Sequence, residues 1–123
     1  MSLEDDNNSM QAKPRQIKNF QLPNGKEPFK EWLFTLKDIY GKGRIIDRLE
    51  RIELGNLGKT RSAGEVHELK IDVGPGYRVY FGFDGPVLVI LLCGGDKGTQ
   101  KKDILTAEKY WADYKVQKDK KYE

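Results

Sequence analysis

Residues 66–104 constrain the fold more than any other part of this 123-residue chain. Three runs rich in β-branched and aromatic residues follow one another there, at 66–73, 77–83 and 87–93, and turn-forming glycine and proline residues separate them. Apolar and polar residues alternate in the first two runs, so each would present one apolar and one polar face. The third run is apolar on both faces, as expected of a strand in the middle of a sheet. We therefore expect a three-stranded antiparallel meander.

The turn Gly74-Pro75-Gly76 sets the expected register of the first two strands. A reversal centred on Pro75 predicts four cross-strand pairs: Val73–Tyr77, Asp72–Arg78, Ile71–Val79 and Lys70–Tyr80. Three of these residues, Lys70, Arg78 and Tyr80, would then share one patch on the polar face. An ordinary cross-strand ion pair between Asp72 and Arg78 is one interpretation of this patch, and a binding site is the other.

Helical spacing of apolar residues appears on both sides of the meander. Residues 29–39 predict one helix with Pro28 in its first turn, and residues 45–54 predict a second that stops at Gly55. Gly41-Lys42-Gly43 would break the pattern between them, which suggests a helical hairpin. A last helix is expected at residues 100–116.

The segments between these helices and strands complete the expected order. Residues 15–22 predict an edge strand, and residues 56–64 predict a loop. The whole is an α+β fold: an N-terminal strand, a helical hairpin, the meander and a C-terminal helix, with the helices on one face of one sheet. We expect residues 1–12 to be a disordered acidic extension, 13–116 the folded domain and 117–123 a frayed tail.

The charge of the chain is compatible with a polyanionic partner. It has 22 basic and 19 acidic residues; Glu4, Asp5 and Asp6 lie in residues 1–12, which hold no basic residue, so the rest carries a formal charge of +6. A single histidine and a single cysteine give no zinc-ligand pattern, and we expect no metal or cofactor. Cys93 ends an apolar run and is expected to be a buried thiol. Without an apolar run of about 20 residues or a secretory signal, we expect a cytosolic protein with no membrane partner.

Three segments, RIELGNLG, ELKIDVGPGYRVYF and VILLCGGDKGTQKKDI, resemble the RelE/ParE superfamily of bacterial toxins. The nearest resemblance is to the branch called addiction module killer proteins, which is related to HigB and to a phage protein family, and it extends over about residues 15–114. The resemblance implies a RelE-like fold and the toxin of a type II toxin–antitoxin system. It also implies a helix-turn-helix antitoxin that neutralises the toxin and represses their shared operon, so that operator DNA is contacted only through the antitoxin.

The commonest activity in that superfamily is ribosome-dependent cleavage of mRNA, and the resemblance implies this mRNA interferase activity here. Such an endoribonuclease needs a base for the ribose 2′-hydroxyl, cations for the phosphate and an acid for the leaving 5′-oxygen. By motif, Arg78 corresponds to the arginine on the scissile phosphate and Lys97 to the basic loop after the last strand. Lys70 is the candidate base, since neighbouring cations lower a lysine pKa, and Tyr80 would orient the substrate. Four further residues are expected to bind substrate: Lys59, Arg61, Lys101 and Lys102.

Two positions depart from the cleaving members of the superfamily. Glu68 stands where several of them have a basic residue, and Asp103 stands where they have a late tyrosine or histidine. His67 shares the parity of the apolar face and would point away from the patch. Two other functions therefore stay open: a non-catalytic poison of DNA gyrase of the ParE kind, and a degenerate toxin that only binds its antitoxin.

Overall fold

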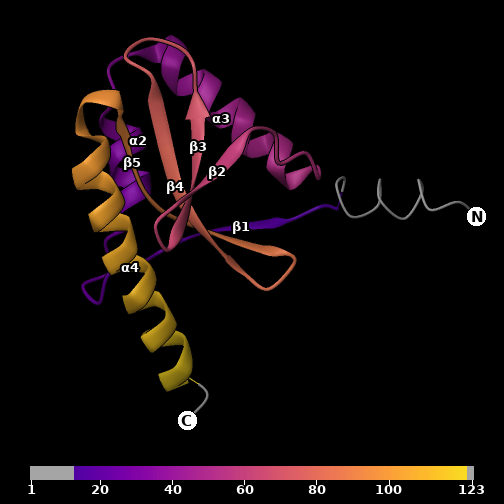
Figure 1. The fold of residues 1–123 in the computed structure, drawn as a ribbon, viewed down its shortest axis with the longest axis vertical. Helices are drawn as coiled ribbons and strands as arrows, with labels where there is room; N and C mark the ends of the chain where they lie inside the picture. Colours follow the sequence, from indigo (N-terminus) through magenta and orange to yellow (C-terminus); the bar gives the residue numbers. More distant parts are fainter. Residues whose placement is uncertain (1–12, 122–123) are drawn as a thin grey trace, which may run out of the picture.

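A five-stranded mixed sheet with helices on both faces forms the body of the protein (Figure 1). The computed structural model describes residues 13–121. Its elements, in chain order, are β1 (Gln16–Asn19), α2 (Pro28–Thr35), α3 (Ile39–Glu53), β2 (Thr60–Ala63), β3 (Val66–Ile71), β4 (Tyr77–Asp84), β5 (Leu88–Asp96), the 3₁₀ turn η1 (Lys97–Thr99) and α4 (Gln100–Lys121). The α+β class predicted from the sequence is confirmed.

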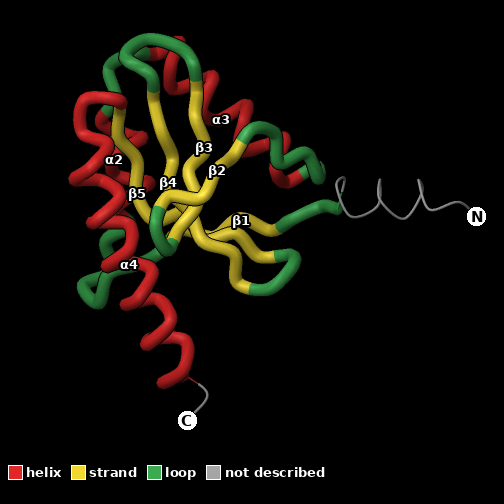
Figure 2. Tube along the Cα trace, in the orientation of Figure 1, coloured by secondary structure: helices red, strands yellow, loops and turns green. Residues whose placement is uncertain are grey.

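The sheet has the strand order β1-β5-β4-β3-β2. The predicted meander is present as β3, β4 and β5, all antiparallel, and β1 adds to β5 in parallel (Figure 2). The prediction of a loop at residues 56–64 was wrong in its second half, because Thr60–Ala63 pairs with β3 as an edge strand. This strand is short, polar and largely exposed, so it carries none of the apolar alternation by which a strand is recognised in a sequence.

The register of the β3–β4 hairpin differs from the prediction by two residues. Lys70 pairs with Arg78 and Glu68 with Tyr80, because the turn is wider than a reversal centred on Pro75. The strand pairing closes at Ile71, and the turn is held by backbone bonds within residues 71–76. A shift of two residues keeps every side chain on its expected face. Lys70 and Arg78 therefore still share one face, now as direct neighbours.

Helices cover both faces of the sheet, which corrects the prediction that they pack on one. Phe29 of α2 and Ile45 of α3 belong to one apolar cluster, whereas Ala107 of α4 belongs to a second cluster on the opposite face. The second cluster includes Tyr80, which is fully buried. The "polar" face of β4 is thus largely a covered face, because α4 supplies a second apolar layer.

The helix α3 begins at Ile39 and runs through Gly41-Lys42-Gly43, where the sequence suggested a break. Asp38 caps it: one carboxylate oxygen accepts from the Gly41 amide at 3.0 Å, and the other accepts from the Tyr77 hydroxyl at 2.9 Å. A Cβ on Gly41 would lie 2.5 Å from the Tyr77 ring. Gly41 therefore serves close packing against β4 and does not end a helix.

The last strand and the last helix are both longer than the sequence indicated. β5 continues through Gly94 and Gly95 to Asp96, and α4 continues to Lys121 instead of ending near residue 116. Side chains of flanking helices occupy the space that a Cβ on either glycine would fill. The expected extension at residues 1–12 lies outside the described residues. Within residues 13–121, no helix has the length and apolar character needed to cross a bilayer.

Candidate nucleic-acid interface

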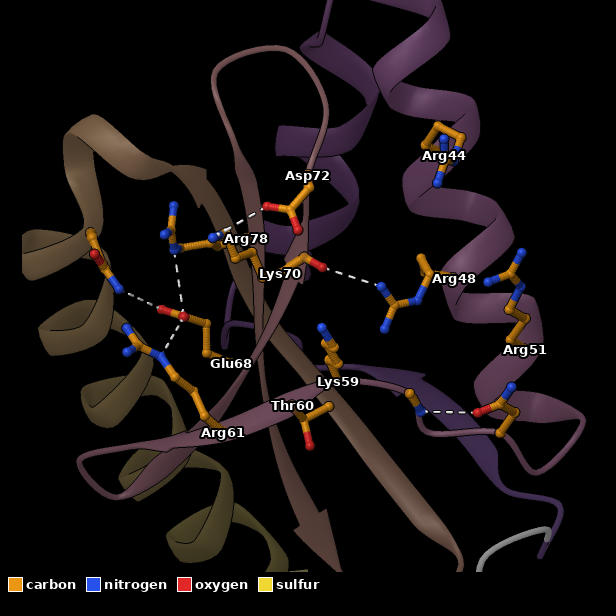
Figure 3. Close-up of a pocket in the computed structure, with 13 residues that line it drawn as sticks. Arg44, Arg48, Arg51, Lys59, Thr60, Arg61, Glu68, Lys70, Asp72 and Arg78 are labelled. Carbon is orange, nitrogen blue, oxygen red and sulfur yellow. Dashed lines mark hydrogen bonds and ion pairs between the residues drawn. The ribbon is translucent and has the colours of Figure 1, made fainter.

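A cavity of about 690 Å³ opens between α3 and the hairpin of β2 and β3 (Figure 3). We call it the basic groove. Seven basic and two acidic side chains line it, together with four uncharged residues: Arg44, Arg48, Arg51, Asn56, Gly58, Lys59, Thr60, Arg61, Glu68, Lys70, Asp72, Arg78 and Gln100. Such an excess of cations in one concave surface attracts anions.

One wall of the groove is a row of arginines on α3. Arg44, Arg48 and Arg51 are separated by four and three residues, which places them on one helix face. Arg48 reaches across to β3 and donates to the main-chain oxygen of Lys70 at 3.2 Å. Burial lowers the pKa of Arg48, and the charges of Arg51 and Arg44 lower it further. An anion bound here would relieve that repulsion.

Glu68 is the most deeply buried charged residue that lines the groove, and it contacts three other lining residues. Its side chain is 1% exposed, and one oxygen accepts from Arg61 Nε at 2.7 Å and lies 3.5 Å from Arg78 Nε. The other oxygen accepts from the Gln100 amide at 2.9 Å. Burial acts to raise the pKa of Glu68, but the hydrogen bonds from Arg61 and Gln100 and the charge of Arg78 bring it below its ordinary value. Glu68 is therefore held as a carboxylate.

Lys70 and Arg78 differ in their surroundings although they are cross-strand neighbours. The Lys70 side chain is half exposed and forms an ion pair with Asp72 at 3.2 Å. Arg78 is 7% exposed, and its Nη1 donates to the Gly76 main-chain oxygen at 3.1 Å. The expected pairing of Asp72 with Arg78 is thus replaced by two pairs, Asp72 with Lys70 and Glu68 with Arg78.

Four of the residues predicted from the sequence come together in the groove: Lys59, Arg61, Lys70 and Arg78. The other four, Tyr80, Lys97, Lys101 and Lys102, do not line it. Burial and the neighbouring Glu68 charge raise the pKa of Tyr80, whose ring is covered by α4.

The three lysines lie at the start of α4 and in the turn before it, and all are exposed. Lys97 lies close to Arg78: the Lys97 Cβ and the Arg78 Nη1 atom each lie 3.7 Å from the position that a Cβ on Gly76 would take. Phosphate groups that extend beyond the groove toward β4 could therefore meet Lys97.

Sequence reasoning missed the α3 arginines and the central position of Glu68. The spacing R-x₃-R-x₂-R in residues 44–51 was a signal for the first, because a helical period puts these side chains in one row. His67 was predicted to face away from the patch, and this is confirmed: its ring stacks on Phe81 with centroids 5.6 Å apart. It is not available to the groove as a proton donor or acceptor.

No family model matches the sequence. A protein of Haemophilus influenzae that is described as uncharacterized is 49% identical over 81 residues, which make up 65% of this chain and 82% of that relative. The two proteins belong to one family. The description of this relative names no activity, so this similarity assigns no chemistry to the groove.

The basic groove is suited to a chain of phosphates. Arginine guanidinium groups bind phosphate oxygens in pairs of parallel hydrogen bonds, and lysines act as mobile point charges. Cations come from α3, β2, β3 and β4, so they would surround a ligand on two sides. An elongated polyanion fits this arrangement better than a single small anion, because the cations form a row along α3 and a second group at Glu68.

Proposed function

We propose that this protein binds RNA in the basic groove and is the toxin of a type II toxin–antitoxin module, acting as a ribosome-dependent endoribonuclease on mRNA. The observation that carries the proposal is the concentration of seven basic side chains in one groove against two acidic ones. The proposed activity rests on the RelE/ParE resemblance, and the proposed RNA-binding surface rests on the groove.

The pair Lys70 and Arg78 is the proposed reaction centre. Because these residues are opposite each other across β3 and β4, one phosphodiester could contact both. Arg78 would bind the non-bridging oxygens, and Lys70 would act as the general base that takes the proton of the 2′-hydroxyl. The 2′-oxygen would then attack phosphorus to form a 2′,3′-cyclic phosphate, the bond from phosphorus to the 5′-oxygen would break, and the 5′-oxygen would take a proton from water.

The remaining cations would position the strand. The α3 arginines and Lys59 lie along the groove away from Arg78, so they would hold phosphates on one side of the cut (Figure 3). Such contacts fix register and orientation without reading sequence. The choice of cut site would then depend on which codon the ribosome exposes, as the ribosome-dependent cleavage implied by the resemblance requires.

Expression without the antitoxin tests this function. Wild-type protein should arrest growth, and mapping of mRNA 5′ ends should show new ends within translated frames. Arg78→Lys and Arg78→Ala should abolish both effects, whereas Lys109→Ala, an exposed lysine of α4 outside the groove, should leave both intact. Growth arrest that persists in Arg78→Ala would refute the proposed centre.

A specific observation favours a second candidate, a non-catalytic poison of DNA gyrase. Tyr80 is buried and Lys97 does not line the groove, so the set of groups expected for cleavage is reduced to Lys70 and Arg78. A protein that only binds its target does not need a catalytic set. A DNA-damage response in cells whose mRNA remains uncut would select this function, and a complete lack of growth phenotype would indicate a protein that only binds its antitoxin.

A further inference from the structure

Glu68 is an unexpected residue for a groove that binds polyanions. Its side chain is almost wholly buried, next to Arg61 and next to Arg78, the arginine that the proposed function assigns to phosphate. By charge alone it would repel a phosphate and reduce the positive potential of the groove. A structural reason is needed for a carboxylate at this position.

The geometry of its contacts gives that reason. Glu68 accepts a hydrogen bond from Arg61 Nε and forms a longer ion pair, at 3.5 Å, with Arg78 Nε. In Figure 3 the Nη ends of both guanidinium groups point away from the carboxylate. An arginine that is held at its Nε edge keeps Nη donors for phosphate oxygens; in Arg78 this applies to Nη2, because Nη1 already donates to the Gly76 main-chain oxygen.

Three elements of the fold meet at this one carboxylate. Arg61 comes from the edge strand β2, Arg78 from β4 and Gln100 from the first residue of α4. The Gln100 amide engages the second oxygen and so fixes the rotation of the carboxylate plane. Arg61 is mostly exposed, and its position therefore depends on Glu68 more than on packing.

We propose that Glu68 is a positioning residue, which holds Arg61 and Arg78 so that their outer edges form one binding point for a phosphodiester of RNA. This inference rests on the proposed function and names the part of the groove that grips the phosphate. Arg61 thereby becomes the partner of Arg78 on the phosphate, and Glu68 itself does not touch RNA. The energetic gain is that two long side chains are ordered before the ligand arrives.

The test uses Glu68→Gln and fluorescence anisotropy of a labelled single-stranded RNA with the full chain. Charge alone predicts tighter binding, because the substitution removes a negative charge from the groove. Positioning predicts weaker binding, by about tenfold, the equivalent of one charge-assisted hydrogen bond. A neutral amide oxygen makes no ion pair, so it holds the two arginines less firmly than the carboxylate does.

Asp72→Asn is the matched control. Asp72 is the other acid of the groove and is exposed, and it pairs only with Lys70 among the contacts described above. Its substitution removes the same charge without releasing either arginine. It should increase RNA affinity, because it removes a negative charge from the groove. Circular dichroism establishes that both variants are folded at the temperature of the assay.

Two further readouts separate positioning from a general loss of structure. The slope of log K against log salt should become shallower by about 0.7 in Glu68→Gln, the value of one lost phosphate contact on a single strand. In an Arg61→Ala background, the effect of Glu68→Gln on affinity should shrink, because one of the positioned groups is already gone.

The possible failures are distinguishable. If wild-type protein does not bind RNA, the proposed function fails and this inference fails with it. If wild-type protein binds, and Glu68→Gln binds equally well or more tightly, only the positioning role is overturned. An effect of Glu68→Gln that is the same with and without Arg61 would overturn it as well.

Discussion

Salt should weaken RNA binding by this protein steeply, and the slope can be worked out from the groove. Binding of a basic surface to a single strand releases counterions, so log K falls with log salt at a slope of about −0.7 for each neutralised phosphate. Seven basic side chains line the groove, and two acids offset part of their charge. Between five and seven phosphate contacts give a slope of about −3.5 to −5.

The consequence is large enough to measure without ambiguity. A fourfold increase in salt, from about 50 to about 200 mM, should reduce affinity by about a hundredfold to a thousandfold. Loss of one cation should make the slope shallower by about 0.7. Arg51→Ala and Lys59→Ala are suitable variants, because both side chains are exposed and neither is held by Glu68.

Anisotropy titrations at four or more salt concentrations provide the assay. Lys109→Ala is the matched control for Lys59→Ala, since both lysines are exposed and only Lys59 lines the groove. The control should keep the wild-type slope. A wild-type slope shallower than about −2, or equal slopes for Lys59→Ala and Lys109→Ala, would refute the assignment of this groove as the RNA surface.

Three other predictions concern the folded body. Gly82→Ala should lower the free energy of unfolding in urea by about 1–3 kcal/mol, because the new Cβ would lie 2.5 Å from the Trp111 ring. Gly43→Ala in α3 should raise the free energy of unfolding by about 0.5–1 kcal/mol, because nothing lies within 4 Å of the new Cβ. Equal effects of the two substitutions would contradict the packing described here. Burial raises the pKa of the Cys93 thiol to about 12, so Cys93 should resist a disulfide reagent at neutral pH until the protein unfolds, and rapid labelling of native protein would contradict its burial. Burial lowers the pKa of His67 in the folded protein, so the neutral side chain contributes its full stability above pH 6.5, the ordinary pKa. This contribution should be lost as the pH falls through the lower pKa of the folded state. The urea midpoint of His67→Gln should therefore depend less on pH than that of the wild type, and an equal dependence would argue against the burial of His67.

Local sequence patterns predicted much of the sheet. Alternation of apolar and polar residues identified the meander and placed Lys70 and Arg78 on one face, and this parity holds because a two-residue shift in register returns each side chain to its own face. Helical spacing identified α2, α3 and α4, although the first predicted helix ran to residue 39, whereas α2 ends at Thr35 and Ile39 begins α3. The same spacing did not predict that α3 continues through Gly41. A small residue is needed at this position because it packs against Tyr77, which is 36 positions further along the chain.

The site depended on tertiary contacts to a greater extent. The sequence by itself determined which cations exist and which strand face Lys70 and Arg78 share. Only the folded structure brought the α3 arginines to the hairpin, covered Tyr80 with α4 and placed Glu68 between Arg61 and Arg78. The physical reason is range: a periodic pattern reports the direction of a side chain within its own element, whereas burial and ion pairing depend on elements that are distant in the chain.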